Sequence, residues 1–166
     1  DWSNDEIKQI KEKMAQSPWH TRYHVEPKMG LLNDPNGFSY FDGKWILFYQ
    51  NFPFGAAHGL KSWVQLESDD LVRFTETGVK VLPDTPLDSH GAYSGSAMQF
   101  GDQLFLFYTG NVRDENWIRH PYQIGALMDK DGKITKIDKI LIDQPADSTD
   151  HFRDPQIFNF KGQYYA

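Results

Sequence analysis

The sequence contains the same hairpin signal three times, at a nearly constant spacing. Each copy is a Phe that ends a β-prone run and is followed by a two-residue turn: Phe41-Asp42-Gly43, Phe100-Gly101-Asp102 and Phe160-Lys161-Gly162. The distance along the chain from Phe41 to Phe100 is nearly the same as that from Phe100 to Phe160. This distance is called the repeat below. A long repeat with several strands per unit is typical of β-propeller blades. The sequence therefore predicts an all-β fold of repeated antiparallel sheets.

A polar, turn-like cluster precedes each hairpin. The clusters are Asn33-Asp34-Pro35, Tyr93-Ser94-Gly95-Ser96 and Arg153-Asp154-Pro155. In a propeller the first strand of each blade lines the central channel, so we expect the three clusters to meet at one end of the axis. The segment from Asn33 to Gly37 reads as a tight turn between apolar runs, and a carboxylate in that setting is either hydrogen-bonded or poised for chemistry. A purely structural Asp34 is the alternative.

The repeat divides the chain into a leader and three units. We predict an N-terminal helix and lead-in over 1–22, then a partial propeller over 23–166, with blade one at about 30–85, blade two at about 90–145 and the start of blade three at 152–166. Strands are expected at 37–40, 45–50, 62–68, 75–79, 94–100, 103–109, 122–128, 134–137, 156–160 and 163–165. Ser3 and Glu6 have capping-box spacing and predict a helix over 4–16.

Two further stretches resemble ligand sites but have simpler explanations. His20 and His24 lack the spacing of metal ligands, so hydrogen-bonded structural roles are favoured. The segment from Asp129 to Gly132 lacks the remaining ligands of a calcium loop and is interpreted as a hairpin turn. We expect neither a metal ion nor a cofactor.

Bulk properties narrow the possible partners. The net charge of −6 argues against nucleic acid and anionic membranes as partners. No run is apolar enough to span a bilayer, and no signal peptide is recognisable. The absence of cysteine excludes disulfides and thiol chemistry and fits a cytoplasmic location. Aromatic residues make up 15% of the chain, which suits either a sugar-stacking site or an aromatic core.

Length limits how much of a propeller is present. The 166 residues hold two complete repeats and the opening hairpin of a third, whereas propellers close with about four to eight blades. An open propeller would expose an unpaired strand edge. The chain is therefore predicted to be the N-terminal part of a larger protein, and self-association through the open edge is a further expectation.

Five motifs, in order, resemble glycoside hydrolase family 32, the invertases and fructanases. They are Asn33-Asp34-Pro35-Asn36-Gly37, Phe48-Tyr49-Gln50, Ser68-Asp69-Asp70-Leu71-Val72, Ser94-Gly95-Ser96-Ala97 and Phe152-Arg153-Asp154-Pro155. The similarity extends from Tyr23 to the last residue. Within the family, the chain is most similar to the bacterial members that act on sucrose 6-phosphate. This similarity depends on residues 111–117 and on the absence of cysteine.

The resemblance implies a five-bladed parent propeller and a retaining β-fructofuranosidase that acts on a small sugar, sucrose or its 6-phosphate. It makes Asp34 the nucleophile and Asp154 the transition-state stabiliser. The family's general acid is a Glu downstream of Arg-Asp-Pro, which is absent from this chain, so these residues alone are expected to be inactive. The substrate-binding residues that we predict are Leu31, Leu32, Asn33, Gln50, Trp63, Tyr93, Ser94 and Arg153.

Some details depart from the family pattern. His58-Gly59 stands where the family often has Trp-Gly, and Trp63-Val64-Gln65-Leu66 stands where it has Trp-Gly-His-Ala. The family pattern therefore does not predict which residues form the leaving-group side of the pocket. If the substrate is phosphorylated, the candidate phosphate ligands are Lys61, Arg113, Arg119 and His120. A non-catalytic sugar-binding propeller, a protein-interaction propeller and an arabinanase- or xylosidase-type enzyme remain as alternatives.

Overall fold

Two four-stranded antiparallel sheets and a short hairpin follow one helix. The computed structural model describes residues 3–166, so the first two residues of the predicted N-terminal segment lie outside the described part. The first sheet contains, in order, β1 (Leu31–Phe41), β2 (Lys44–Phe52), β3 (Ser62–Ser68) and β4 (Thr75–Val81). The second contains β5 (Ala92–Phe100), β6 (Gln103–Arg113), β7 (Arg119–Met128) and β8 (Ile134–Lys136). The hairpin pairs β9 (Phe158–Phe160) with β10 (Gln163–Tyr165), and the helix is α1 (Asn4–Ala15).

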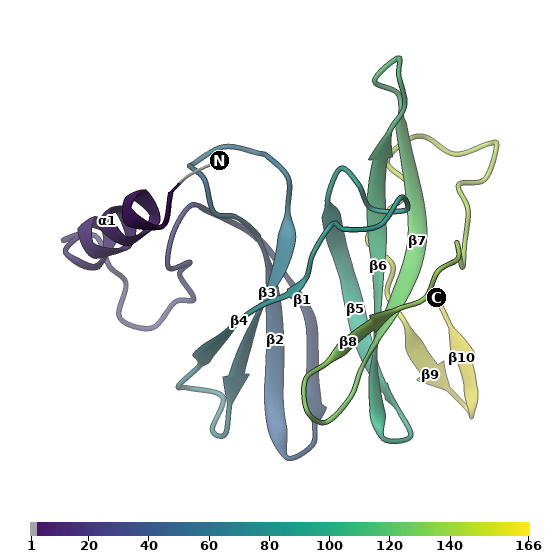
Figure 1. Ribbon diagram of the computed structural model, residues 1–166. Coiled ribbons are helices and arrows are strands. Elements are labelled where there is room, and N and C mark those ends of the chain that lie inside the picture. The colour runs from purple at the N-terminus through teal and green to yellow at the C-terminus, as the bar shows by residue number, and fades with distance from the viewer. Residues whose placement is uncertain (1–2) are drawn as a thin grey trace.

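The three predicted hairpins are confirmed. Each closes through a two-residue turn, because Phe41 pairs with Lys44, Phe100 with Gln103 and Phe160 with Gln163. In the first turn both central residues have positive φ, 47° at Asp42 and 81° at Gly43. Turns of this kind match the twist of the flanking strands, which explains why Asp-Gly is favoured there. The all-β partial propeller is thus the observed architecture (Figure 1).

The interpretation of residues 33–37 as a tight turn is wrong. They belong to β1, which begins at Leu31 instead of residue 37. Two register shifts against β2, between Leu32 and Pro35 and between Asn36 and Ser39, absorb one extra residue each. β-Bulges bend a strand and redirect its side chains, and they tolerate a proline that has no N–H to pair. Turn-forming residues here therefore shape a strand.

A shared core joins the two sheets, whose first strands β1 and β5 lie next to each other (Figure 1). Trp63 of β3 lies at its centre with no exposed surface and packs against Phe48 of β2 and Tyr108 of β6. The remaining buried members come from both sheets and include Phe41, Ile46, Val81, Ala92, Leu104, Leu106, Ile124, Ala126 and Met128. Burial of these side chains fixes the angle between the blades, and with it the relative position of the β1 and β5 ends.

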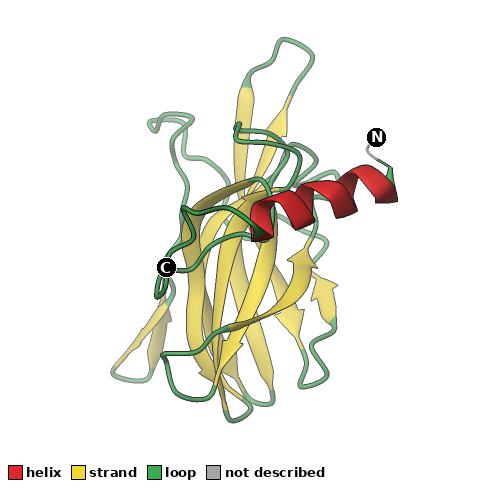
Figure 2. Ribbon diagram, turned by 90° about the vertical axis from the view of Figure 1, so that its left-hand side faces the viewer, coloured by secondary structure: helices red, strands yellow, loops and turns green. Residues whose placement is uncertain are grey.

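Helix α1 lies outside the sheets and buries none of its side chains (Figure 2). Its predicted capping box is present, since Ser3 and Glu6 exchange hydrogen bonds, and the helix ends one residue before the predicted end. His20 is a structural histidine as expected: its ring bonds the Glu26 carboxylate at 2.6 Å and the Met14 carbonyl at 2.6 Å. No helix among residues 3–166 is long and apolar enough to cross a membrane.

Strands β6 and β7 extend beyond their predicted ends and project from the body of the molecule (Figures 1 and 2). Arg119 and His120 therefore begin β7, which the sequence predicts to start only at residue 122. Arg113 pairs directly with Arg119 across the ladder, so the true loop is 114–118. The predicted turn between β7 and β8 is confirmed, because the Asp129 carboxylate accepts the backbone N–H of Lys133 at 2.9 Å.

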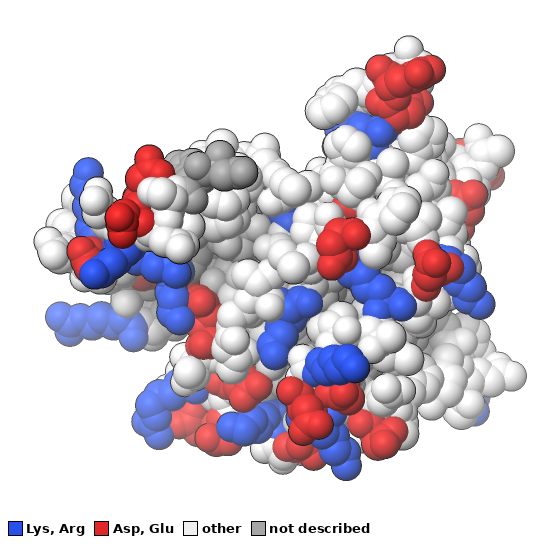
Figure 3. Space-filling view, viewed as in Figure 1, with Lys and Arg blue, Asp and Glu red and all other residues white. Residues whose placement is uncertain are grey.

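Charged side chains of both signs are interspersed on the face shown in Figure 3, where Lys and Arg lie beside Asp and Glu. Ion pairs between neighbouring strands also occur, such as Lys44 of β2 with Glu67 of β3 at 3.7 Å. Three expectations stay predictions. They are the lack of nucleic-acid or membrane partners, the self-association through the open edge, and the domain boundaries.

Candidate active site

A cavity of about 400 Å³ opens where the starts of β1 and β5 meet the segment before β9. It is lined by Asn33, Asp34, Gln50, His58, Gly59, Lys61, Tyr93, Arg119, Arg153 and Asp154. All three polar clusters that precede the hairpins contribute to this lining, as the repeat predicts. Two carboxylates and several cations thus face one small volume.

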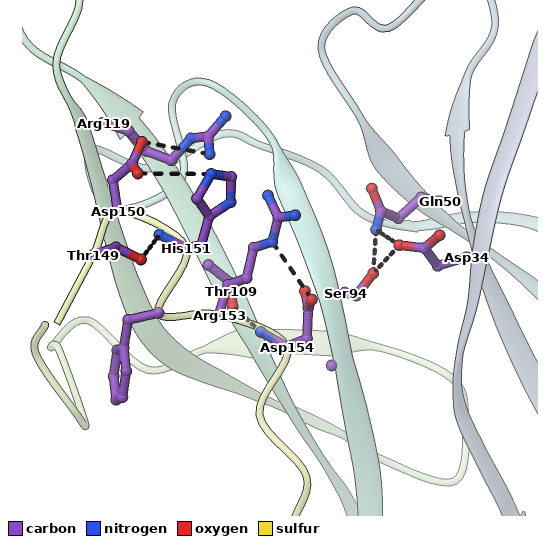
Figure 4. A network of polar contacts seen from close by, with 12 residues as sticks. Asp34, Gln50, Ser94, Thr109, Arg119, Thr149, Asp150, His151, Arg153 and Asp154 are labelled. Carbon is purple, nitrogen blue, oxygen red and sulfur yellow. Dashed lines mark hydrogen bonds and ion pairs between the residues drawn. The ribbon is translucent and has the colours of Figure 1, made fainter.

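The Asp34 carboxylate is anchored by side chains from both blades (Figure 4). Its Oδ2 accepts a hydrogen bond from the Ser94 hydroxyl at 2.7 Å and one from Gln50 Nε2 at 3.2 Å. Gln50 Nε2 also donates to the Ser94 hydroxyl, and both of these side chains are buried. This arrangement holds one oxygen in place and leaves the other directed elsewhere.

Three residues of the site occupy the same position in three successive units of the repeat. Asp34, Ser94 and Asp154 follow one another at equal intervals of one repeat. A bulge in β5 between Ala92 and Gly95 matches the first bulge of β1. The bulges turn Asp34 and Ser94 toward each other across the blade boundary.

A second set of hydrogen bonds links the units next to the site, two residues further along each strand. The N–H of Gly95 in blade two donates to Asn36 Oδ1 of blade one at 3.2 Å. The N–H of Ile157 in the third unit donates to the Ser96 hydroxyl of blade two at 2.9 Å. Asn36 and Ser96 are each two residues beyond Asp34 and Ser94, so the repeat extends to the contacts that fix the blades to one another.

Asp154 has a left-handed backbone and a half-exposed side chain, with φ at 63°. Its carboxylate Oδ2 lies 3.6 Å from Arg153 Nε. Burial raises the pKa of Asp154 above its usual value, and the negative charge of Asp34 adds to that rise, whereas Arg153 opposes it. Asp34 and Asp154 are therefore close enough to sense each other's charge, as two carboxylates of one site should.

The other half of the cavity is basic. Lys61 is buried, and its ammonium lies 2.9 Å from His58 Nδ1. The Lys61 ammonium and the Arg119 guanidinium lie 5.8 and 6.0 Å from the centre of the Tyr93 ring. Burial lowers the pKa of Lys61, against the opposing influence of Asp34. These contacts hold two cations beside one aromatic ring, an arrangement that suits an anionic or polyhydroxyl ligand.

Two polar atoms at the cavity point to further hydrogen-bonding capacity. Asn33 Oδ1 and Arg119 Nε are buried and have no hydrogen-bond partner among the described residues. Both residues line the cavity. Buried polar atoms normally find a partner, so a ligand with hydroxyl groups or oxyanions would complete the site. Within residues 3–166, no group of three His, Asp or Glu side chains is arranged to hold a metal ion.

The structure brings together most of the predicted residues. Asn33, Asp34, Gln50, Tyr93, Arg153 and Asp154 line the cavity, as do Lys61 and Arg119, and Ser94 bonds Asp34. The prediction of Trp63 as a substrate-binding residue is wrong, because its side chain is fully buried in the core. Its indole N–H donates instead to the Tyr93 carbonyl at 3.0 Å.

Four other predicted residues lie outside the lining. The Leu31 carbonyl accepts a hydrogen bond from Asn51 at 3.0 Å, and Leu32 packs on the outer cluster of Tyr49, Val64 and Leu66. Arg113 and His120 interact within the projecting hairpin: Arg113 lies on the Trp117 ring, and His120 contacts Asp114 at 3.2 Å. These contacts use the side chains or backbone groups for structure, so their predicted substrate roles are not supported.

The sequence patterns do not single out two buried polar residues next to the site, Thr109 and Gln123. The Thr109 hydroxyl accepts the N–H of Asp154 at 2.9 Å and donates to Gln123 Oε1 at 2.7 Å. The repeat contained a signal for one of them, since Gln123 lies one repeat after Trp63. Local pattern alone places both in ordinary strands.

Comparison with known proteins agrees with this geometry. The profile of the Glycosyl hydrolases family 32 N-terminal domain matches residues 24–166. A sucrose-6-phosphate hydrolase of Streptococcus mutans is 72% identical over 166 residues, which are 100% of this chain and 35% of that protein. The chain thus spans about a third of the length of this curated relative.

Solved structures show the same similarity. The structure of sucrose-6-phosphate hydrolase from Lactobacillus gasseri has a TM-score of 0.96 and 49% identity, over 99% of this chain and 34% of that one. A mutant β-fructofuranosidase of Bombyx mori, solved in complex with sucrose, has a TM-score of 0.78 and 29% identity, over 98% of this chain and 36% of that one. The fold and the site region are therefore shared with longer sugar hydrolases.

Proposed function

The chain belongs to glycoside hydrolase family 32, and on this premise we propose that the complete protein is a retaining β-fructofuranosidase acting on sucrose 6-phosphate or sucrose. The observation that carries the proposal is the anchored Asp34 carboxylate, which faces Asp154 in the same cavity. Two donors on one oxygen hold the Asp34 carboxylate in a fixed orientation, which a nucleophile requires. The names of the relatives supply the substrate class.

The proposed reaction has two steps. Asp34 attacks the anomeric carbon of the fructosyl unit, the bond to the glycosidic oxygen breaks, and a general acid outside these 166 residues gives that oxygen its proton. Water then cleaves the fructosyl–Asp34 ester and restores the carboxylate. Asp154, whose side chain is half exposed at the cavity, binds sugar hydroxyls more tightly as positive charge develops on the ring.

The test compares wild type with Asp34→Asn in the complete natural protein that contains these residues. We expect sucrose hydrolysis to fall by at least about 10³-fold, because an amide does not form the ester. The wild type should release fructose with retained configuration, read by NMR during the first turnovers. Asp42→Asn is the matched control, since Asp42 lies in the distant β1–β2 turn with a positive φ that Asn also accepts. Full activity of Asp34→Asn would remove Asp34 as the nucleophile, whereas the absence of hydrolysis in wild type and variant alike would make a non-catalytic sugar-binding propeller the better proposal.

We further propose that Lys61 and Arg119 bind the phosphate when the substrate is phosphorylated. Both cations line the cavity beside Tyr93, and the buried Nε of Arg119 is without a hydrogen-bond partner among residues 3–166. The guanidinium also lies 3.7 Å from the Asp150 carboxylate through Nη1, so its Nε is the donor that a phosphate would take. The location of the protein in the cytoplasm stays a prediction.

Arg119→Ala tests the phosphate proposal in the complete protein. We expect kcat/KM for sucrose 6-phosphate to fall about 10- to 100-fold and that for sucrose to change by less than about threefold. Arg113→Ala is the matched control, because Arg113 pairs with Arg119 across the ladder but contacts Trp117 outside the cavity. An equal loss on both substrates would remove Arg119 as a phosphate ligand.

A further inference from the structure

A buried polar pair lies behind the cavity, in the second blade. Thr109 of β6 and Gln123 of β7 face each other in the ladder and are 0% and 2% exposed. The Thr109 hydroxyl donates to Gln123 Oε1 at 2.7 Å. Polar side chains buried in a sheet are costly unless their hydrogen bonds serve the structure, so the remaining bonds of the pair show what it does.

Two of the remaining bonds go to the backbone around Asp154, and a third, from Gln123 Nε2 to the Pro121 carbonyl at 3.3 Å, stays within β7. The Asp154 N–H donates to Thr109 Oγ1 at 2.9 Å, and Gln123 Nε2 donates to the Phe152 carbonyl at 2.9 Å. The two bonds bracket Arg153, in a stretch that has no regular secondary structure. Figure 4 shows Thr109 next to the backbone nitrogen of Asp154, to which a dashed line joins it. A non-glycine residue with φ at 63° is strained, and bonds to a rigid sheet keep it in that conformation.

The direction of the hydrogen bonds is fixed along the whole chain of groups. The carbonyl of Phe152 accepts only, so the Gln123 amide must present its nitrogen there and its oxygen to Thr109. The hydroxyl of Thr109 uses its one proton on that oxygen and its lone pair for the Asp154 N–H. Because every donor and acceptor is assigned, a single arrangement of Asp154 satisfies the chain.

Blade one contains a similar contact, whose acceptor lies one residue further along the repeat. Trp63 precedes Gln123 by one repeat and also lies on the third strand of its blade. Its indole N–H donates to the Tyr93 carbonyl, in the segment that brings Ser94 to the site. The third strand of each blade therefore donates a hydrogen bond to the site segment of the next unit.

We propose that Thr109 and Gln123 are positioning residues that hold Asp154 at the place and orientation needed to bind the sugar. The proposal rests on the role given to Asp154 under the proposed function. Thr109 contacts the backbone of Asp154, so it acts through Asp154 and does not need to touch the substrate. Loss of its hydroxyl should release the left-handed turn and let the carboxylate move away from the ring.

The experiment uses Thr109→Val and Thr109→Ser in the complete natural protein. Valine keeps the shape and removes the acceptor, and we expect kcat/KM for sucrose to fall about 10- to 100-fold. Serine keeps the hydroxyl and should retain activity within about threefold of wild type. Thr135→Val in β8, at an exposed position, is the matched control and should leave activity unchanged. If valine prevents folding, Thr109→Ala, which leaves room for a water, replaces it.

A double-mutant cycle with Asp154→Ala separates positioning from general destabilisation. If Thr109 acts through Asp154, Thr109→Val should cause no further loss in the Asp154→Ala background, since coupled residues are not additive. The acidic limb of the pH profile should also move to lower pH in Thr109→Val, because a loosened carboxyl loses the burial that raises the Asp154 pKa.

Two outcomes overturn the inference, and they are distinguishable. Full additivity of the two substitutions, or equal activity of the valine and serine variants, would reject the positioning role and leave the proposed function intact. Wild-type activity of Asp154→Ala would instead reject the role of Asp154 in the proposed function, and the positioning role with it.

Discussion

Asp34 is held by its carboxylate, whereas Asp154 is held by its backbone. Ser94 and Gln50 donate to Oδ2 of Asp34, and the sheet position of Asp34 is set by bulges in β1. Asp154 is anchored through its N–H on Thr109, and its half-exposed carboxylate has Arg153 beside it. A nucleophile needs one oriented, ionised oxygen, and a group that binds hydroxyls needs oxygens free to accept. The difference in anchoring therefore agrees with the difference in proposed roles.

The comparison also shows how a repeat can produce unlike groups. Asp34, Ser94 and Asp154 occupy the same position of three units, but only the first two lie in a strand. In the first two units a bulge directs the side chain toward the blade boundary. In the third, a left-handed residue replaces the bulge, and the side chain points into the cavity from a segment without ladder bonds. Variants that act on the carboxylate or on the backbone should thus affect the two residues differently.

Among variants that keep both carboxylates, the largest effect is expected from Gln50→Glu, which disturbs the hydrogen bonds that hold Asp34. The substitution replaces a donor 3.2 Å from Asp34 Oδ2 by a second carboxylate. Two carboxylates at that distance share a proton, and the pKa of one of them rises strongly. We expect kcat/KM at pH 7 to fall by at least about 10²-fold and the acidic limb of its pH profile to move to higher pH.

Gln50→Leu is the control for this variant, because it removes the hydrogen bond without adding a charge. Its loss should be smaller and its pH profile close to that of wild type. Equal losses and equal profiles in the two variants would show that the charge at position 50 is not sensed by the group that attacks.

A smaller effect is expected from Ser94→Ala. The variant removes a hydrogen bond of 2.7 Å to the Asp34 carboxylate and leaves Gln50 as the second donor. A hydrogen bond to a charged group contributes about 1.5–3 kcal/mol, which corresponds to a fall of about 10- to 100-fold in kcat/KM. Ser39→Ala in β1 is the matched control, because the Ser39 hydroxyl donates to the Gly37 carbonyl and not to Asp34. An unchanged rate in Ser94→Ala would mean that Gln50 alone orients Asp34.

Arg153→Gln tests the Asp154 side through its charge. Burial raises the pKa of Asp154, and the positive charge of Arg153 limits that rise. Removing the charge should raise the pKa further, so a rate that needs ionised Asp154 recovers only at higher pH. We expect the acidic limb of kcat/KM to move up by about half a unit to one unit. Arg153→Lys keeps the charge and should keep the limb in place, and a shift of equal size in both variants would assign the effect to geometry.

The sequence predicts the fold well because the repeat is carried by turns that have few alternatives. Asp42-Gly43 and Lys161-Gly162 need positive φ, and each turn fixes the register of its hairpin. The same rule failed at residues 33–37, because turn-forming residues are equally suited to bulges. Whether such a segment turns or bulges depends on its partner strand, which a local pattern does not contain.

The site is predictable in part, for a related reason. Asp34, Ser94 and Asp154 are found by the repeat and by the family motifs, and Gln50 follows from its strand end. Thr109 and Gln123 are not found, since their role depends on which backbone lies across the blade boundary. Trp63 was assigned to the sugar because aromatic residues serve both cores and sugar sites, and only its burial distinguishes the two.

The smallest effect on activity is expected from Trp63→Phe, the blade-one counterpart of the Thr109 and Gln123 anchor. Phenylalanine removes the indole N–H that donates to the Tyr93 carbonyl and leaves a space in a fully buried site. Stability should fall by about 2–4 kcal/mol, measured by urea unfolding of the complete protein. Activity well below the unfolding transition should fall by less than about fivefold, because Ser94 is still held by its bonds to Gln50 and Asp34. Thr109→Val should show the reverse pattern, with a larger loss of rate for a similar or smaller loss of stability. If Trp63→Phe lowers the rate as much as Thr109→Val does, then the backbone anchor governs both carboxylates, and the distinction between Asp34 and Asp154 fails.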